Sequence, residues 1–314
     1  MATKTILSLD GGGIRGVIPA RILAAIEKQT GKPVCELFDY VAGTSTGGIL
    51  ALCLTKPDAK GKPSFTADQI LQMYKDHGST IFHASFWHQV KSLWSVTGPK
   101  YPADGIEAVL KQYLGDVLLD KSLSRVLIPA FSIDHRAPRF FKSWNVNGNP
   151  VEVIPMWQVA RATSAAPTYF PPFRLLTGAM PCTLVDGGVV SNTPAMCIFA
   201  DAIQSEPPGT KFKVLSIGTG TGNGTIDPVK AAGWGEIQWI QPIIDILMDA
   251  CADTTDYQLL NLLGQLEHDY LRLQIPMTGE GPAMDDVTII PDMIAAADKL
   301  LADKAKEIDE FFAS

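Results

Sequence analysis

The 314-residue sequence lacks the features by which several classes of protein are recognised. Its five cysteines show no Cys-x-x-Cys spacing, so we expect buried thiols rather than a metal site or a disulfide framework. No apolar run reaches the length of about 18 residues that a membrane span requires. The N-terminal segment MATKTILSLD has neither the charged nor the long apolar region of a signal peptide. We therefore expect a soluble protein located in the cytoplasm.

Basic charge is also scarce in this chain. Lys and Arg number 26 against 33 Asp and Glu, which gives a net charge of −7. A nucleic-acid-binding protein would carry a basic face or run, so the composition argues against that class. It also argues against adsorption to an anionic membrane by electrostatics alone. Repeats, low-complexity tracts and Pro/Ser-rich linkers are absent, so we expect one domain over residues 1–314, with a core at about 4–220 and a helical part at about 235–314 packed on it.

Strand and helix patterns alternate along the first half of the chain. The short apolar run Thr5–Leu9 predicts a strand, and isoleucines at four-residue spacing predict a helix at Val17–Thr30. The other predicted strands are Phe38–Ala42, Arg125–Ile133, Arg139–Trp144, Lys213–Ile217 and Tyr270–Gln274, and the other predicted helices are Gly47–Leu54, Ile237–Leu263 and Asp292–Phe312. This alternation predicts an α/β fold in which helices cover both faces of a mostly parallel sheet.

The segment VAGTSTGG places Ser45 between an apolar strand and an apolar helix. Gly43 and Gly47 lie two residues to either side, which completes the Gly-x-Ser-x-Gly arrangement of a nucleophile on a sharp strand-to-helix turn. The N-terminus of the helix favours the negative charge that develops when a serine attacks a carbonyl. The alternative is a helix cap, for which Thr44 or Ser45 would serve.

A glycine-rich loop, DGGGIRG at residues 10–16, follows the first predicted strand and opens the first helix. It satisfies the Gly-x-Gly-x-x-Gly pattern of dinucleotide-binding proteins, although an acid directly before the first glycine is unusual for that pattern. The same loop can instead direct the N–H groups of Gly11, Gly12 and Gly13 at one oxyanion. A plain tight turn is the remaining alternative. Arg15 either anchors this loop or neutralises a phosphate.

No histidine is placed where a serine hydrolase would need its base. The five histidines are His77, His83, His88, His135 and His268. In contrast, the run TLV leads directly into Asp186-Gly187-Gly188, which puts the Asp186 carboxylate at a strand end, the usual place for catalytic groups in parallel sheets. A carboxylate serves as a base near neutral pH when burial raises its pKa. Asp186 is therefore the predicted proton acceptor, and a simple Asp-Gly turn is the alternative.

DGGGIRG, GTSTGG and DGG, in this order, resemble the patatin-like phospholipase family. The resemblance includes RATSAAPTYFPP at Arg161–Pro172, LSIGTG at Leu215–Gly220, and DYLRLQ followed by MDD, so it covers nearly the whole chain. SNTP at Ser191–Pro194 departs slightly, because many relatives carry two asparagines before this proline. The resemblance implies a three-layer α/β/α patatin-like fold, a Ser45–Asp186 dyad and no cofactor or catalytic metal. The implied oxyanion hole is Gly11, Gly12 and Gly13, with supporting positions at Arg15, Gly43, Gly47, Gly187 and Gly188.

The activity that this resemblance implies is hydrolysis of fatty-acyl esters in phospholipids, lysophospholipids or other lipids, of phospholipase A or lysophospholipase type. Two alternatives are an acyltransferase that uses the same acyl-serine, and a storage or signalling protein whose hydrolysis is incidental. The stretch Ile81–Tyr101 suits either a lid in peripheral contact with a membrane or a hydrophobic cap over the core. Its aromatic and basic residues are Phe82, Phe86, Trp87, Trp94 and Tyr101, with Lys91 and Lys100.

Overall fold

A central β-sheet runs through the computed structural model, which describes residues 2–81, 98–145, 151–177, 181–222, 226–265, 268–277 and 283–313. The strands of this sheet are β1 (Thr3–Leu9), β2 (Tyr40–Gly43), β3 (Arg125–Ser132), β4 (Ala137–Lys142), β5 (Phe173–Leu175), β6 (Cys182–Asp186), β7 (Lys211–Ile217) and β9 (Asp269–Leu273). They follow the order β5-β6-β3-β2-β1-β7-β9, and β4 also pairs with β3. The neighbours β3, β2, β1, β7 and β9 are parallel, which confirms the predicted α/β class.

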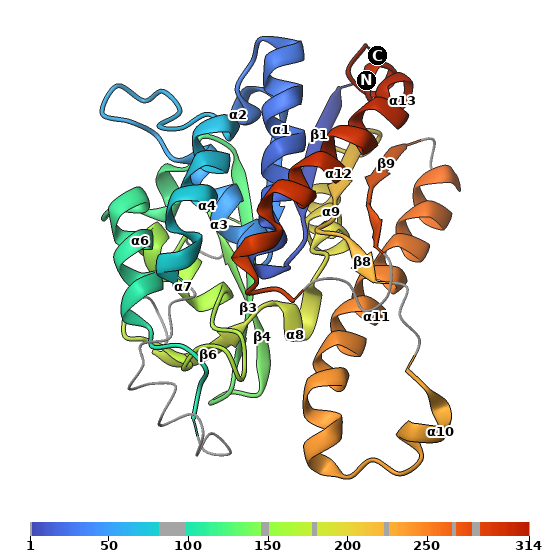
Figure 1. Ribbon diagram of the computed structural model, residues 1–314. Coiled ribbons are helices and arrows are strands. Elements are labelled where there is room, and N and C mark those ends of the chain that lie inside the picture. The colour runs from blue at the N-terminus through green and yellow to red at the C-terminus, as the bar shows by residue number, and fades with distance from the viewer. Residues whose placement is uncertain are drawn as a thin grey trace.

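Helices cover the two faces of the sheet, as Figure 1 shows. Successive side chains of a strand point to opposite faces, and on β1 Leu7 joins the larger apolar core whereas Ile6 joins a smaller one. The larger core includes α1 (Val17–Thr30), α3 (Thr46–Thr55), α4 (Ala67–Ile81), α6 (Asp104–Leu114) and α7 (Met156–Thr163). The smaller core includes α9 (Ala195–Ser205) and α11 (Glu236–Gln265). The chain therefore has the expected three layers, α/β/α.

The strands β2 and β6 lie along the same edge of β3. β2 pairs with the start of β3 as far as Leu127, whereas β6 pairs antiparallel with β3 from Ala130 onward. The opposite edge of β3 is occupied by β4, so β6 takes the edge that β2 leaves. Asp186 ends a strand, as predicted, but the rule for parallel sheets does not apply to it because β6 is antiparallel to β3. β6 runs against β3, and its carboxyl end points back toward the carboxyl end of β2.

The C-terminal helix is broken, although one continuous helix was predicted over Asp292–Phe312. It consists of α12 (Ile290–Asp303) and α13 (Ala305–Ala313), which meet at Lys304, whose φ of −108° and ψ of 13° are not helical. The apolar period continues through the break, because Ala297, Ile308 and Phe311 are all buried. On either side of the break, α12 packs on α1 and α13 packs on β9. The sequence pattern predicted a helix here but not the bend.

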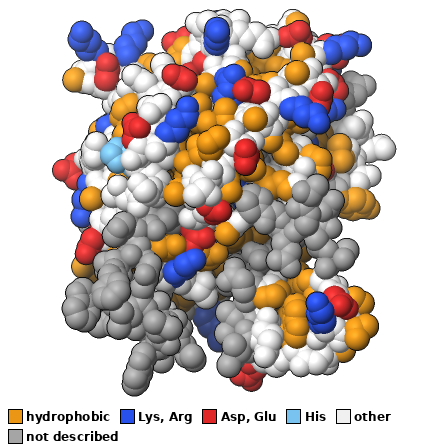
Figure 2. Space-filling view, viewed as in Figure 1, with side chains coloured by type: hydrophobic (Ala, Val, Ile, Leu, Met, Phe, Trp, Pro, Cys, Tyr) orange, Lys and Arg blue, Asp and Glu red, His pale blue; other side chains and the backbone are white. Residues whose placement is uncertain are grey.

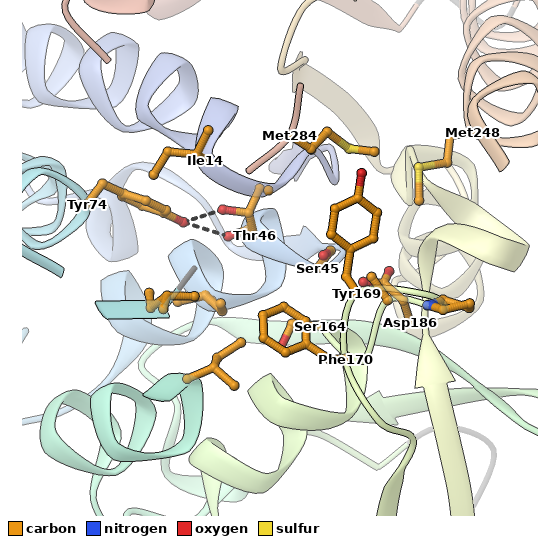
Figure 3. A pocket seen from close by; sticks show the side chains of 17 residues that line it. Ile14, Ser45, Thr46, Tyr74, Ser164, Tyr169, Phe170, Asp186, Met248 and Met284 are labelled. Atoms are coloured by element: carbon orange, nitrogen blue, oxygen red, sulfur yellow. Dashed lines mark hydrogen bonds between the residues drawn. The ribbon is translucent and has the colours of Figure 1, made fainter. Parts of the chain in front are cut away.

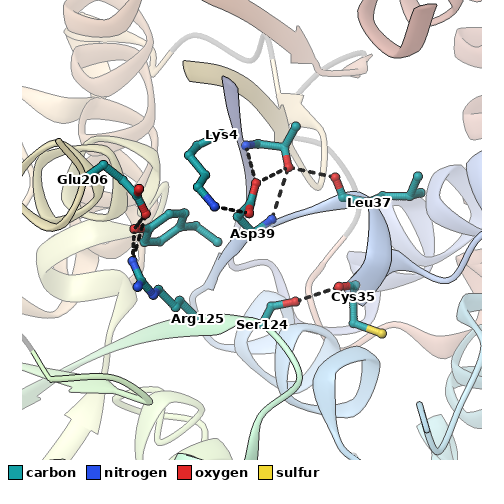
Figure 4. Close-up of polar contacts among 9 residues, drawn as sticks. Lys4, Cys35, Leu37, Asp39, Ser124, Arg125 and Glu206 are labelled. Carbon is teal, nitrogen blue, oxygen red and sulfur yellow. Dashed lines mark hydrogen bonds and ion pairs between the residues drawn. The ribbon is translucent and has the colours of Figure 1, made fainter. Parts of the chain in front are cut away.

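Polar contacts join the strands at the end of the sheet where β1, β2 and β3 begin (Figure 4). Lys4 pairs with Asp39 at 2.7 Å, and the Thr5 hydroxyl donates to the Leu37 carbonyl oxygen at 2.8 Å. Arg125 pairs with Glu206 at 3.0 Å. These groups pair with one another, and they lie at the opposite end of the parallel strands from the turns that follow β1 and β2. We therefore regard this network as structural.

Exposed apolar side chains lie on α10 (Pro228–Ala231) and on the first half of α11, which project from the molecule. Figure 2 shows hydrophobic side chains gathered on this projection. Val229 is 82% exposed, and Ile243, Ile246 and Leu247 are 40–49% exposed. No helix among the described residues is long and apolar enough to cross a membrane.

The predicted lid falls largely outside the described residues, which resume at Gly98. Its members Phe82, Phe86, Trp87, Lys91 and Trp94 all lie in the part that the structure does not describe. Its last residue, Tyr101, is buried and donates a hydrogen bond to Asp285 Oδ2 at 2.7 Å, and Lys100 forms an ion pair with the same carboxylate. The lid therefore stays a prediction.

Candidate active site

Ser45 stands on a sharp turn between β2 and α3. Its φ of 54° and ψ of −121° are rare for a residue with a side chain, and such strain persists only where the surroundings impose it. The two glycines allow the turn to close. A Cβ on Gly43 would lie 2.0 Å from the Gly47 carbonyl oxygen, and one on Gly47 would lie 2.3 Å from the main chain of β1. The Thr163 hydroxyl completes the support, because it accepts from the Ser45 N–H at 3.0 Å and donates to the main chain of β3 at 2.6 Å.

Asp186 ends β6 and is completely buried. Its Oδ1 accepts a hydrogen bond from the Gly188 N–H at 2.7 Å, whereas Oδ2 has no hydrogen-bond partner among the described residues. Burial raises the pKa of Asp186 to about 7, and the Gly188 N–H, the Ser45 hydroxyl and the Arg161 guanidinium act in the opposite direction. Near neutral pH this carboxyl group can therefore both take up and release a proton.

The N–H groups of the glycine-rich loop differ in whether they already make hydrogen bonds. The N–H of Gly11 donates to the Asn192 carbonyl oxygen at 3.1 Å, and the N–H of Ile14 donates at 2.8 Å to a carbonyl in the C-terminal part of the chain. Within the described residues, the N–H groups of Gly12 and Gly13 make no hydrogen bond. The structure thus leaves two of the three predicted oxyanion donors free and engages Gly11.

Residues far along the chain hold this loop in place. Arg272 on β9 makes two hydrogen bonds to the buried carboxylate of Asp10, at 3.1 and 2.6 Å. The acceptor for the Ile14 N–H is the Met284 carbonyl oxygen, and the Thr219 hydroxyl donates to the loop at the Gly11 carbonyl oxygen, at 2.6 Å. The Arg15 Nε contacts the Gly12 carbonyl oxygen at 3.5 Å, which fits the loop-anchoring interpretation of this arginine.

An apolar pocket joins these parts. Ser45 and Asp186 both line it, and Tyr169, Met248 and Met284 surround them (Figure 3). Its remaining walls are largely aliphatic and aromatic, from Ile14, Ile49, Ile81, Ile106, Pro167 and Phe170. Gly12 and Gly13 also border the pocket. Because Gly12 and Gly13 face apolar walls, their surroundings disfavour the pyrophosphate of a dinucleotide.

The histidines that the structure describes lie elsewhere. The His77 ring packs edge-on against Tyr113, and His135 Nδ1 lies 2.9 Å from the Ser132 hydroxyl. His268 Nδ1 accepts from the Phe212 N–H at 3.3 Å. None of these three lines the pocket, and His83 and His88 lie outside the described residues.

Sequence reasoning did not single out Thr163, Arg161, Asn192 and Arg272 individually. Thr163 and Arg161 belong to the RATSAAPTYFPP run. Arg272 is the one charged residue of the predicted strand Tyr270–Gln274, and a lone charge in such a strand is a sequence signal for a buried ion pair. Arg161 is 1% exposed, donates to the Pro171 carbonyl oxygen at 2.8 Å, and supports the segment beside Asp186.

The fold and the site together define a class: an α/β protein with a candidate serine nucleophile on a strained turn beside a buried carboxylate and an apolar pocket. The model of the patatin-like phospholipase family matches residues 7–197. The chain belongs to this family.

Named relatives extend the match over most of the chain. Patatin-like protein 2 of Oryza sativa subsp. indica is 35% identical over 97% of this chain and 85% of the relative, and patatin-like protein 2 of Arabidopsis thaliana is 36% identical over 91% and 79%. A Solanum tuberosum relative named probable inactive patatin-3-Kuras 1 is 33% identical over 91% and 82%. The family supports lipid hydrolysis as the class of activity. Because one relative is named as inactive, the case for this chain rests on its own site.

Proposed function

We propose that this protein is a lipid acyl hydrolase that cleaves fatty-acyl esters through an acyl-serine on Ser45, with Asp186 as the base. The observation that carries the proposal is the joint position of a strained serine and a fully buried carboxylate in the wall of one apolar pocket. Phospholipids and lysophospholipids are the proposed substrates, in a phospholipase A or lysophospholipase type of reaction.

In the acylation step, the Ser45 Oγ attacks the ester carbonyl carbon and its proton passes to Asp186. Oδ2 of Asp186 is the oxygen with capacity to accept this proton, because Oδ1 already accepts from the Gly188 N–H. The tetrahedral intermediate then collapses, and the alcohol leaves with the proton from Asp186. Water hydrolyses the acyl-serine by the same exchange, and the fatty acid is released.

The proposed oxyanion hole consists of the Gly12 and Gly13 N–H groups. Both residues border the pocket and neither N–H has a partner among the described residues, so they can donate to the developing oxyanion without breaking an existing bond. Donors that are fixed before the reaction stabilise the transition state at no cost of reorganisation. The three contacts from Arg272, Met284 and Thr219 supply that fixation. The acyl chain would occupy the aliphatic walls of the pocket.

Fluorophosphonate labelling combined with lipid hydrolysis tests this proposal. We expect the probe to modify Ser45 in the wild-type protein and to leave the Ser45→Ala variant unmodified, with loss of fatty-acid release from a lysophospholipid. The matched control is Ser164→Ala, because Ser164 lines the same pocket while its hydroxyl donates to the Ala160 carbonyl oxygen. Labelling of Ser45→Ala, or hydrolysis by it at the wild-type rate, contradicts the nucleophile assignment.

Contact with a lipid surface is proposed for the exposed face at the start of α11. Met248 on this helix lines the pocket, and the neighbouring Leu247 is 49% exposed. An apolar surface next to the pocket suits a substrate that enters from a membrane. We expect Leu247→Glu to reduce hydrolysis of vesicle lipids while a soluble short-chain ester is still cleaved. Leu260→Glu, at an exposed position 13 residues further along the same helix, is the control. Equal losses on both substrates would contradict this contact.

A further inference from the structure

A second cavity lies next to the catalytic pocket. Its walls are polar and charged, in contrast to the first: they include Arg15, Thr219, Asp249 and Gln274. Tyr169, Met248 and Met284 line both cavities. The two spaces therefore adjoin at these three side chains, and one is suited to an acyl chain and the other to water.

Asn192 lines the polar cavity and is 8% exposed, yet its Oδ1 has no hydrogen-bond partner among the described residues. This oxygen lies close to both proposed catalytic residues. Asn192 Oδ1 and the Ser45 Cβ lie within 3.4 Å of the point that a Cβ on Gly11 would occupy. Asn192 Oδ1 and Asp186 Oδ1 lie within 3.4 Å of the equivalent point on Gly188. The carboxamide oxygen is thus positioned beside the serine and the carboxylate at once.

Asn192 Oδ1 is a buried acceptor without a donor, and so is Oδ2 of Asp186, the carboxyl group whose Oδ1 lies near Asn192 Oδ1. An unsatisfied buried acceptor is costly, and two of them in one place fit a ligand that brings two donors. A water molecule has two O–H groups and is the smallest such ligand. The methyl end of Met248 borders this place, at 2.9 Å from the same point on Gly188, and a methionine side chain can move aside readily.

We propose that Asn192 binds the water molecule that hydrolyses the acyl-enzyme, and that this water enters from the polar cavity. The inference rests on the proposed function. Once the acyl chain fills the apolar pocket, the polar cavity is the open route to the ester. One O–H of the water donates to Asn192 Oδ1 and the other to Asp186 Oδ2.

Hydrolysis of the acyl-serine transfers one proton from water to Asp186 and then to Ser45. The water oxygen bonds to the acyl carbonyl carbon, and one of its protons passes to Asp186. The oxyanion formed then collapses, the bond between that carbon and Ser45 Oγ breaks, and Asp186 returns the proton to Oγ. The fatty acid leaves with the remaining O–H, which Asn192 held throughout. Asn192 thus acts in deacylation and is not required for the attack of Ser45.

Pre-steady-state kinetics with a p-nitrophenyl ester test this role. In the Asn192→Ala and Asn192→Leu variants, we expect deacylation to slow about tenfold, the change that corresponds to one lost hydrogen bond. Acylation should stay within about threefold of the wild-type rate, because the Asn192 main-chain bond to Gly11 is retained in both variants. The nitrophenol signal should then show a burst equal to one equivalent of enzyme. Added hydroxylamine, a stronger nucleophile than water, should restore turnover by releasing the acyl group as a hydroxamate.

Fluorophosphonate labelling of Ser45 identifies which variants keep a competent site, and Asn192→Ser is added as a third substitution. Equal losses in acylation and deacylation, or turnover that hydroxylamine does not restore, overturn the proposal. Failure of all three variants to label overturns it too, since Asn192 would then be needed for attack by Ser45. If Ser45→Ala hydrolyses the ester as fast as the wild-type protein, the proposed function itself fails, which is a distinct result.

Discussion

The buried carboxylate of Asp186 should lower the stability of the fold at neutral and alkaline pH. Burial raises its pKa from an ordinary value of 3.8 to about 7, so the unfolded chain releases this proton at a lower pH than the folded protein does. The free energy of unfolding therefore falls as the pH rises between those two values and is then constant. Since each pH unit in this window is worth about 1.4 kcal/mol, the penalty reaches about 4 kcal/mol at pH 8.

The substitution Asp186→Asn isolates this effect. In the wild-type protein the Gly188 N–H donates to Asp186 Oδ1 at 2.7 Å. Asparagine has the same shape and an oxygen that can accept this hydrogen bond, but it does not ionise. We expect the variant to be inactive and more stable than the wild-type protein, by about 4 kcal/mol at pH 8 and by less than about 1 kcal/mol at pH 4. Urea unfolding followed by tryptophan fluorescence at a series of pH values from 4 to 8 measures the difference.

The control for this series is Asp303→Asn, which removes an exposed carboxylate at the end of α12. Its stability should differ from that of the wild-type protein by no more than about 0.5 kcal/mol at each pH. A stability gain of Asp186→Asn that is the same at pH 4 and pH 8 would refute the reasoning, because the gain would then come from packing rather than from a buried charge.

Three further predictions concern the same site. The value of kcat/KM for a soluble ester should rise with pH to a plateau with a midpoint near pH 7, because Asp186 must be ionised to accept the proton; a midpoint near pH 4 would exclude it as the base. Arg272→Met should destabilise the fold by about 3–5 kcal/mol in urea unfolding, since it leaves the Asp10 carboxylate buried without its partner; an unchanged midpoint would contradict this. Gly12→Ala should reduce kcat about 100-fold, because the new Cβ would lie 2.2 Å from the Thr219 hydroxyl oxygen and would displace a proposed oxyanion donor. Gly264→Ala is the control: a Cβ there would have no atom within 4 Å, so kcat should be unchanged.

The elements around Ser45 were predictable because their determinants are local. The helix Val17–Thr30 matches its predicted bounds, and the turn at Ser45 follows from two glycines within five residues. The position of Asp186 was inferred from a rule for parallel strands, whereas its strand is antiparallel. Its place beside Ser45 depends on which edge of β3 is free, and that is decided by the pairing of β2 and β4.

Contacts between distant parts of the chain were not predictable from the pattern of residues. Arg272 and Asp10 are 262 positions apart, and neither local sequence indicates that the two residues form an ion pair. The hydrogen bond from the Gly11 N–H to the Asn192 carbonyl oxygen likewise depends on the tertiary fold. Because of this bond, the Gly11 N–H is already engaged, whereas those of Gly12 and Gly13 can bind an oxyanion. Local sequence shows that a glycine loop can bind an anion, but tertiary contacts decide which of its N–H groups do so.

The anchoring of the glycine loop by Arg272 and Met284 has a consequence for biosynthesis. The family match ends at residue 197, yet both anchors lie beyond it and are translated after Ser45 and Asp186. A nascent chain that already contains Ser45 and Asp186 lacks them, and so its loop is not fixed. We therefore expect ribosome-bound chains to be inactive toward esters until the C-terminal segment has emerged and folded. The order of synthesis thus delays the proposed ester hydrolysis until the segment through Met284 has been made.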